Sequence, residues 1–166
     1  ITLMLINKQG VEISKTALIT GITGQDGSYL TEFLLNKGYK VHGIVRRVAL
    51  DSRTHRLWRI KHLLEKINLH SASLESYASI CKIVSLTKPE EVYHLAAQSY
   101  VDYSFEDEFS TLNTNINGTH YILSALKEFS QDSRFYFAGS SEMFGKAAQA
   151  PQDEKTPFHP RSAYGI

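Results

Sequence analysis

The sequence has only one cysteine, Cys81, among its 166 residues. No disulfide can therefore form within the chain, and a lone thiol is typical of a protein from a reducing compartment. We expect the protein in the cytoplasm. Cys81 lies in an apolar stretch with helical spacing, so we expect its side chain to pack in the interior.

Long hydrophobic runs are scarce as well. No segment approaches the roughly 20 apolar residues that span a bilayer. The opening residues 1–6 are too short for a secretory core and lack a basic start. The formal net charge of +1 gives no overall attraction to nucleic acid or to a membrane surface. We expect neither as a partner.

Motifs for metal binding and for nucleophilic catalysis are also missing. The seven histidines show no metal-ligand spacing, and no cluster of cysteine and histidine suits zinc. Residues 138–142 lack the second glycine of a nucleophile elbow. His94 lies in an apolar strand pattern, and we expect it to be a hydrogen-bonded interior or edge residue.

The sequence does contain a regular alternation of strand and helix patterns. Strand patterns occur at residues 17–20, 40–45, 67–70, 91–97 and 134–138. Helical spacing occurs at residues 28–36, 57–67, 75–87 and 106–129, and a further helix start is expected near Ser162. Parallel neighbours need crossover connections, so this alternation predicts an α/β fold with a doubly wound parallel sheet of the Rossmann type.

The helical patterns also predict which side chains face the core. In the first helix these are Tyr29, Leu30, Phe33 and Leu34, and in the long helix they are Leu112, Ile116, Ile122, Leu123 and Leu126. An aromatic group is expected to pack around the fourth strand and the helix after it, namely Tyr93, Tyr100, Tyr103, Phe105 and Phe109.

Residues 46–66 are strongly basic, with seven Arg and Lys against two acids. Leu57, Ile60 and Leu63 repeat there with helical spacing. We therefore interpret most of these charges as the solvated face of a helix and not as a nucleic-acid patch, because no aromatic base-reading pattern accompanies them.

Three glycines follow the first strand at a spacing of three and three. Between a strand and a helix, such glycines allow a tight turn, let the backbone approach a pyrophosphate and let the helix pack on the strand. The helix N-terminus offers free N–H groups to phosphates. We predict dinucleotide binding by the whole turn, which comprises Gly21, Ile22, Thr23, Gly24, Gln25, Asp26 and Gly27.

The end of the second strand indicates which dinucleotide binds. NAD sites usually place an acid about 20 residues after the glycines, where it accepts the ribose 2′-hydroxyl. Here Arg46 and Arg47 stand 19 and 20 positions after Gly27. Paired guanidinium groups suit a 2′-phosphate, so the sequence favours NADP. The alternative is that one of the two arginines only faces solvent.

Several stretches together carry a family resemblance. They are residues 21–30 (GITGQDGSYL), 43–47 (GIVRR), 95–99 (LAAQS), 140–146 (SSEMFGK) and 156–165 (TPFHPRSAYG). In this order they resemble the GDP-mannose 4,6-dehydratase family of the extended short-chain dehydrogenase/reductase superfamily. The resemblance runs from about Lys15 to the end. The GQDG turn and the final PRSAYG stretch are its most specific parts.

The resemblance implies a redox-neutral lyase of GDP-fucose biosynthesis. Hydride would leave C4 of GDP-mannose for NADP, water would leave across C5 and C6, and hydride would return to C6, giving GDP-4-keto-6-deoxymannose. It further implies that Tyr164 takes the 4-hydroxyl proton and contacts the cofactor, that Glu142 removes the C5 proton and assists loss of water, and that Ser140 hydrogen-bonds the 4-hydroxyl. Residues implied to line the cofactor are Leu95, Ala96, Ala97, Gln98 and Ser99.

The residue types fit this chemistry in part. Ser140 and Glu142 follow the fifth strand, and two positions apart on an extended segment they would point to the same side. Spacing alone fits a turn serine and a solvent-facing acid equally well. Tyr164 needs help to act as a base, since an unperturbed tyrosine has a pKa of about 10. In this superfamily a lysine four residues later supplies it, at a position beyond Ile166.

The sequence departs from the family at some positions. Ser140 stands where the family commonly has Thr, and Ala72-Ser73-Leu74 replaces Gly-Asp-Leu, which leaves Leu74 to pack on the adenine. The chain does not begin with Met. We expect residues 1–15 to be an extension and residues 16–166 to be an NAD(P)-binding domain, truncated before the C-terminal substrate domain.

Three further expectations concern the oligomeric state, the activity of these residues on their own and the alternative functions. The resemblance implies a homodimer or homotetramer, with residues 46–53 near an interface. We expect these 166 residues alone to bind NADP weakly and to lack useful turnover. Two alternative functions are a related NAD(P)-dependent sugar-nucleotide epimerase or reductase, and a non-catalytic dinucleotide-binding module.

Overall fold

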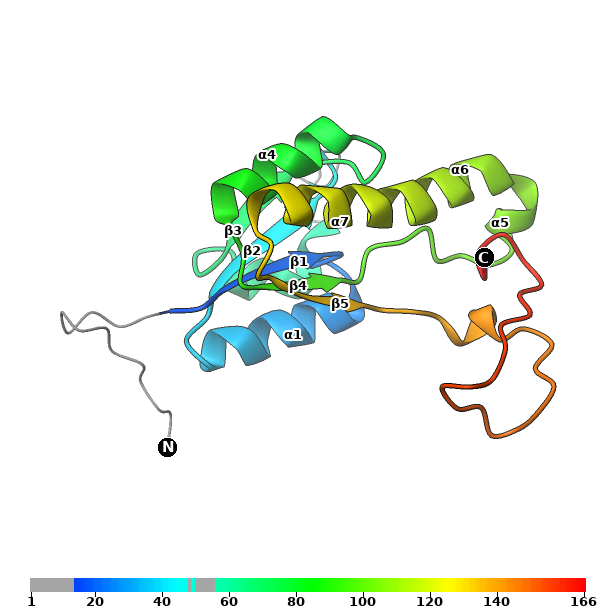
Figure 1. Ribbon diagram of the computed structural model, residues 1–166. Coiled ribbons are helices and arrows are strands. Elements are labelled where there is room, and N and C mark those ends of the chain that lie inside the picture. Colours follow the sequence, from blue (N-terminus) through cyan, green and yellow to red (C-terminus); the bar gives the residue numbers. More distant parts are fainter. Residues whose placement is uncertain (1–13, 48, 50–55) are drawn as a thin grey trace.

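The computed structural model describes residues 14–47, 49 and 56–166, and its centre is a parallel five-stranded sheet (Figure 1). The strands are β1 (Thr16–Thr20), β2 (Lys40–Val45), β3 (Asn68–Ser71), β4 (Glu91–His94) and β5 (Arg134–Phe137), in the order β3-β2-β1-β4-β5. The predicted doubly wound α/β fold is confirmed. Strand β2 pairs with one edge of β1 and strand β4 pairs with its opposite edge, so the strand order reverses direction at β1. The carboxyl ends of β1 and β4 therefore flank the crevice where such sheets bind ligands.

Helices cover both faces of the sheet. Helix α1 (Gln25–Asn36) lies on one face, whereas α4 (Tyr77–Thr87) and α7 (Gly118–Phe129) lie on the other (Figure 1). The 3₁₀ helix η1 (Trp58–Leu63) shares the core of α1. The helices α5 (Tyr103–Glu106) and α6 (Glu108–Leu112) and the π-helical turn η2 (Asn113–Asn117) lead into α7, and the short 3₁₀ turn η3 (Ser141–Met143) follows β5.

Alternation along the strands creates two hydrophobic cores. Ile19, Val41 and Leu34 belong to the core on the α1 side, and Leu18 and Val92 belong to the core under α4 and α7. The half-buried Cys81 packs against the second core, as expected. Both cores are mainly aliphatic.

The basic segment has the predicted solvated face. Leu57, Ile60 and Leu63 are buried against the α1 core, whereas Arg56 and Arg59 are exposed. The helix there is a 3₁₀ helix, and Arg53 lies outside the described residues.

The prediction for the inward face of α1 was partly wrong. Tyr29 and Phe33 are 66% and 55% exposed, and the buried face instead consists of Gly27, Ser28, Thr31 and Leu34. A Cβ atom on Gly27 would lie 2.8 Å from the Cα atom of Ile22. Helix α1 thus approaches the turn after β1 so closely that its buried positions over the first two turns are the small residues Gly27, Ser28 and Thr31, with Leu30 half-buried beside them.

The single helix expected at residues 106–129 is divided into α6, η2 and α7. Ile122 and Leu126 are buried as predicted and Leu112 is half-buried, but Ile116 and Leu123 are 49% and 44% exposed. The prediction was wrong for these two because both side chains line a pocket beyond the carboxyl ends of the strands and do not pack on the sheet.

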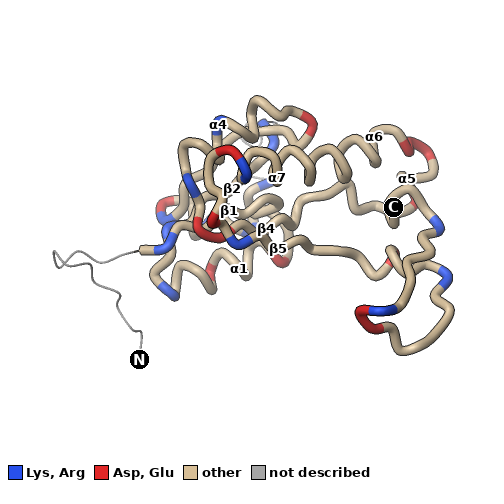
Figure 2. Tube along the Cα trace, in the orientation of Figure 1, with Lys and Arg blue, Asp and Glu red and all other residues tan. Residues whose placement is uncertain are grey.

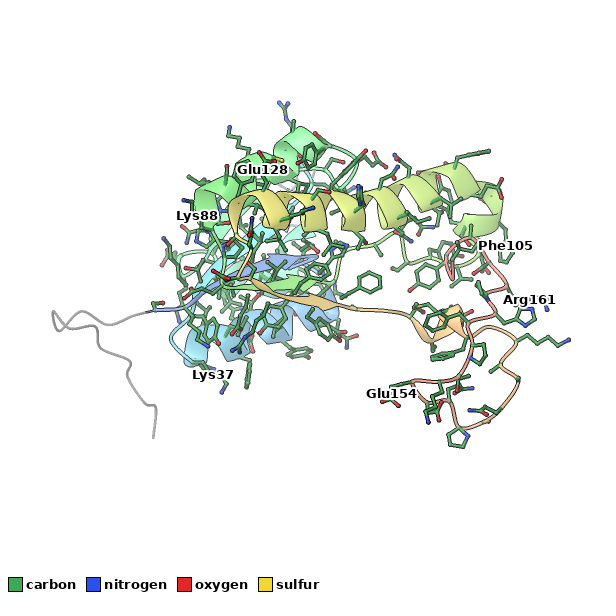
Figure 3. All side chains as sticks on the ribbon, viewed as in Figure 1. Lys37, Lys88, Phe105, Glu128, Glu154 and Arg161 are labelled. Carbon is green, nitrogen blue, oxygen red and sulfur yellow. The ribbon has the colours of Figure 1, made fainter. Side chains whose placement is uncertain are left out.

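The expected aromatic packing around β4 was wrong for four of five residues. Tyr93 is half-buried against the α1-side core, but Tyr100, Tyr103, Phe105 and Phe109 are 67%, 38%, 68% and 79% exposed. Helices α5 and α6 extend past the carboxyl ends of the strands, where no sheet lies beneath them, and Phe105 points outward (Figures 1 and 3).

Two predicted boundaries also differ. Strand β4 ends at His94 and not at residue 97. The Leu95 N–H group still reaches the Thr20 backbone oxygen at 3.3 Å as well as the Thr20 hydroxyl, but the Ala96 amide bonds to that hydroxyl instead of continuing the ladder. Ser162 starts a turn and not a helix, closed by the Gly165 N–H group on the Ser162 oxygen at 3.0 Å. Four residues after Ser162 are too few to close a run of helical hydrogen bonds.

Candidate functional site

The predicted glycine turn connects β1 to α1 at the carboxyl edge of the sheet. Gly21 has a φ of +73°, and a Cβ atom there would lie 2.9 Å from the Ala96 backbone nitrogen. The Gly24 N–H group donates to the Gly21 oxygen at 2.9 Å. A Cβ atom on Gly27 would collide with the same oxygen. The tight turn and the close helix packing that the spacing predicted are both present.

The N-terminus of α1 is open toward the crevice. Gly24 is the N-cap and provides no side-chain cap. In the described part of the chain, the N–H groups of Gln25, Asp26 and Gly27 have no recorded hydrogen-bond acceptor. These donors, with the positive end of the helix dipole, form an arrangement that suits a phosphate. Ile22, which the sequence also assigned to the cofactor, is fully buried.

The predicted 2′-phosphate arginines follow β2 directly. Arg46 and Arg47 are both exposed. Because β2 pairs with β1 in parallel, these arginines lie at the same edge of the sheet as the glycine turn. Leu74, which was predicted to contact the adenine, is half-buried against the core under α7. It packs closely on that helix, because a Cβ atom on Gly118 would lie 2.9 Å from the Cβ atom of Leu74.

A pocket of about 350 Å³ lies at the carboxyl ends of β4 and β5. Its lining residues are His94, Leu95, Ala96, Ala97, Asn115, Ile116, Thr119, His120, Leu123, Phe137, Ala138, Ser140, Met143, Tyr164, Gly165 and Ile166. No charged residue occurs between residues 109 and 126 or between 135 and 141, so the wall formed by α7 and β5 is uncharged (Figure 2). The predicted catalytic residues Ser140 and Tyr164 meet here, together with the predicted cofactor residues 95–97.

Tyr164 reaches the pocket because the end of the chain folds back onto η3. The His159 N–H group donates to the Met143 oxygen, and the Lys146 N–H group donates to the His159 oxygen, both at 3.1 Å. Gly165 is buried, and a Cβ atom there would lie 2.7 Å from the Glu142 oxygen. Backbone packing at Gly165 therefore fixes the neighbouring Tyr164.

The structure separates Ser140 from Glu142, contrary to the reasoning from spacing. Residues 141–143 form the 3₁₀ turn η3 and not an extended segment, so residues two positions apart do not share a side. The Ser140 Oγ atom accepts the Glu142 N–H group at 3.2 Å and caps this turn. Ser140 lines the pocket, whereas Glu142 is exposed and does not line it.

Gln98 and Ser99 do not line the pocket. The Gln98 side chain is bonded to its own loop and to α6: its Oε1 atom accepts the Tyr100 N–H group at 2.7 Å, and its Nε2 atom donates to Thr111 Oγ1 at 3.1 Å. Ser99 is exposed. Sequence reasoning missed Asn115, which lines the pocket and pairs with the Gln98 backbone. Three asparagines within the helical pattern at 113–117 were the available clue, because Asn is a weak helix former.

His94 is the interior histidine that the sequence predicted. It is 2% exposed, and its ring lies 2.7 Å from Thr20 Oγ1 and 3.1 Å from Thr119 Oγ1. Burial lowers the pKa of His94 to about 4, so the ring is neutral at physiological pH. Its place in the pocket lining was not predicted.

Among the described residues, no three His, Cys, Asp or Glu side chains gather as a metal site would require. No helix in residues 14–47 or 56–166 is long and apolar enough to cross a membrane.

The parallel sheet, the glycine turn and the open N-terminus of α1 define a Rossmann-type domain. Comparison with known families agrees and is more specific. The family model described as GDP-mannose 4,6 dehydratase matches residues 18–166, and the chain belongs to this family.

Curated relatives resemble nearly the whole chain. A GDP-mannose 4,6 dehydratase of Drosophila melanogaster is 45% identical, over 94% of this chain and 41% of that protein. GDP-mannose 4,6 dehydratase 2 of Arabidopsis thaliana is 48% identical, over 93% and 43% respectively. The chain thus spans about two-fifths of the length of these relatives.

Solved structures resemble the fold. The Bordetella bronchiseptica enzyme WbmH in complex with NAD⁺ is 30% identical, with a TM-score of 0.78 over 92% of this chain and 48% of that one. A UDP-glucose 4-epimerase of Thermotoga maritima with UDP-glucose is 26% identical, with a TM-score of 0.75 over 90% and 46%.

Proposed function

We propose that this chain is the amino-terminal part of a GDP-mannose 4,6-dehydratase that works with bound NADP. The observation that carries the proposal is the pocket at the ends of β4 and β5, where Ser140 and Tyr164 lie beside the loop that follows β4. Family membership and the names of the relatives support GDP-mannose as the substrate.

The cofactor assignment has separate support. The open N-terminus of α1 and the glycine turn fit a pyrophosphate. The similar WbmH structure contains NAD⁺, which supports a nicotinamide dinucleotide. The preference for NADP depends on Arg46 and Arg47, whose guanidinium groups suit a 2′-phosphate.

In the proposed reaction, each residue handles a proton or a hydrogen bond. Bound NADP would supply the hydride acceptor for C4 and the hydride donor for C6. Tyr164 takes the 4-hydroxyl proton while Ser140 hydrogen-bonds the same oxygen. Glu142 removes the C5 proton and passes it to the hydroxyl that leaves C6 as water, and the proton taken by Tyr164 is returned to C5 when C6 receives hydride. The oxidation at C4 balances the reduction at C6, so the product differs from the substrate by one water molecule.

The test is to incubate the full-length enzyme with GDP-mannose and NADP and to weigh the product. A product lighter by one water is expected. An unchanged mass with altered sugar stereochemistry would indicate an epimerase, and dinucleotide binding without a product would indicate a non-catalytic module. Either result contradicts the dehydratase.

Glu142 has a matched control in the same segment. We expect Glu142→Gln to lower turnover at least about 100-fold, the usual contribution of a general base, with NADP affinity unchanged. Glu154 is another exposed acid of this segment (Figure 3), and Glu154→Gln should leave turnover unchanged. Full turnover in Glu142→Gln would remove the assigned role.

The arginine pair can be tested by binding. Replacing both Arg46 and Arg47 with Ala should raise the Kd for NADP about 10-fold or more and leave the Kd for NAD nearly unchanged, because charged hydrogen bonds contribute about 1.5–3 kcal/mol. Arg59→Ala, at an exposed arginine over Trp58, is the control. Equal weakening of both dinucleotides would contradict NADP specificity.

We also propose that the enzyme is a homodimer or homotetramer, which sedimentation would measure.

A further inference from the structure

Three hydrogen bonds at the end of β1 have a fixed direction. The Oγ1 atom of Thr20 accepts the N–H groups of Leu95 at 3.2 Å and Ala96 at 3.1 Å. A hydroxyl has two acceptor positions and one proton. Both acceptor positions are therefore used, and the proton must point to the third neighbour, the His94 Nδ1 atom at 2.7 Å.

This direction determines where His94 carries its proton. Because Nδ1 accepts from Thr20, the neutral ring is protonated on Nε2. The Nε2–H group then donates to Thr119 Oγ1 at 3.1 Å, and the Thr119 hydroxyl donates to the Asn115 carbonyl oxygen at 2.7 Å. Every polar hydrogen along this path has an acceptor.

The hydrogen bonds that begin at Leu95 and Ala96 lead back to the same loop, at Gln98. The Asn115 Oδ1 atom accepts the Gln98 N–H group at 2.8 Å, and its Nδ2 atom donates to the Gln98 oxygen at 3.1 Å. The first and last residues of the loop 95–98 are thus tied to one chain of hydrogen bonds. That chain runs from β1 through His94 to the π-helical turn η2.

We propose that His94, in its neutral Nε2–H form, is a positioning residue that holds the loop 95–98 against η2 and so sets the shape of the cofactor pocket. Leu95, Ala96 and Ala97 line that pocket, as do Asn115 and Thr119. The inference rests on the proposed function, because it takes the dinucleotide as the pocket's ligand.

The chain of hydrogen bonds is rigid because its members are buried. Thr20 is fully buried and His94 is 2% exposed, so water cannot replace a lost partner. Removing the Thr20 hydroxyl leaves the Ala96 amide without its acceptor, whereas the Leu95 amide keeps the Thr20 backbone oxygen at 3.3 Å. A buried unpaired donor is costly, so the loop would shift to satisfy the Ala96 amide, and the pocket wall would shift with it.

The decisive experiment compares two changes at Thr20 in the full-length enzyme, with NADP as the probe. Thr20 does not line the pocket, so neither change removes a direct ligand contact. Thr20→Val loses the hydroxyl and should raise the Kd about 10-fold. Thr20→Ser keeps the hydroxyl but loses a buried methyl group, so it should lower the melting temperature while the Kd stays within about twofold. Equal affinity in the wild type and Thr20→Val would overturn the inference.

A second pair of variants tests the other end of the path. Thr119 and Thr87 each donate to the carbonyl four residues earlier in a helix, at 2.7 and 2.8 Å, but only Thr119 also accepts from His94. We expect His94→Gln and Thr119→Val to raise the KM for NADP severalfold with kcat within about twofold at saturation. Thr87→Val should change neither constant. A fall in kcat with an unchanged KM would contradict a positioning role.

NMR of the ligand-free enzyme separates the two proposals. The ¹⁵N spectrum should show His94 protonated on Nε2, and Ala96 amide exchange should be slow in the wild type and faster in Thr20→Val. A proton on Nδ1 would overturn the inference even if NADP binds. An enzyme that binds neither NADP nor NAD would overturn the proposed function and the positioning role together, whereas the NMR result would still report whether the hydrogen-bond chain exists.

Discussion

Glu91 is a buried acid at the amino-terminal edge of the sheet, opposite the pocket. Its carboxylate accepts the hydroxyls of Tyr93 at 2.8 Å and Tyr39 at 3.1 Å, and the Lys15 ammonium at 3.4 Å. Burial alone would raise the pKa of this carboxyl, but these three hydrogen bonds outweigh burial and hold the pKa below its usual value. Burial and the bond to Glu91 raise the pKa of Tyr93 to about 12.

We expect Glu91→Gln to lower the free energy of unfolding by about 1–3 kcal/mol at pH 7, because the amide cannot accept all three donors. Urea denaturation would measure this. Glu128→Gln is the control, since Glu128 is exposed and accepts a single hydroxyl, from Tyr77. Equal losses in the two variants would contradict a special role for Glu91.

The pH dependence of stability should change as well. A carboxyl whose folded pKa is below its unfolded pKa stabilises the fold above the unfolded value, and that contribution is lost as pH falls through the folded value. The wild type should therefore lose stability faster than Glu91→Gln on acidification below about pH 4.5, the carboxyl's ordinary pKa. Parallel curves would contradict this.

Strands β2 and β3 are joined by a histidine pair on the α4 side of the sheet. The His42 Nδ1 and His70 Nε2 atoms lie 2.8 Å apart, and the rings are stacked. Such a bond needs one nitrogen without a proton. Burial, His70 and Lys40 together lower the pKa of His42 to about 4, and burial lowers the pKa of His70.

The pair makes β2–β3 pairing sensitive to acid. Between about pH 6.5 and 4, the unfolded histidines bind more protons than the folded ones, so stability falls as pH falls. Replacing His42 with Leu should reduce this loss by about 1 kcal/mol in denaturation curves recorded from pH 7 to 4.5. Asn68→Ala, at an exposed residue of β3, should keep the wild-type dependence. An unchanged slope in His42→Leu would contradict the assignment.

Short-range sequence patterns predicted where the helices and strands lie more accurately than they predicted which helix face is buried. The glycine spacing located the turn and α1 because each glycine has a local geometric task. Tyr29 and Phe33 could not be assigned correctly, because the distance between α1 and β1 depends on Gly27 meeting Gly21. Ile116 and Leu123 were misplaced because an apolar helical pattern does not distinguish a side chain that lines a pocket from one that packs on the sheet.

At the scale of the molecule, large apolar side chains remain exposed at the β5 side. Ile116, Leu123 and Phe137 line the pocket and are 49%, 44% and 49% exposed. We expect the 166-residue chain alone to bind NADP weakly, to bind a hydrophobic dye such as ANS and to make no keto-deoxy product. The full-length enzyme should bind less dye and show turnover. Dehydration of GDP-mannose by the chain alone would contradict this.

The candidate site was predicted mainly through the family resemblance. The resemblance supplied Ser140, Tyr164 and residues 95–97, and the structure places them in one pocket. The partners of His94 could not be predicted, since Thr20 and Thr119 lie 74 and 25 residues away and only the sheet brings them together.

This arrangement limits how the enzyme can be re-engineered. A graft that carries only residues 95–98 from a relative would import a loop without the strand hydroxyl and helix amide that fit it. Successful chimeras should exchange Thr20, His94 and Asn115 along with the loop, because these distant positions form one transplantable unit with it.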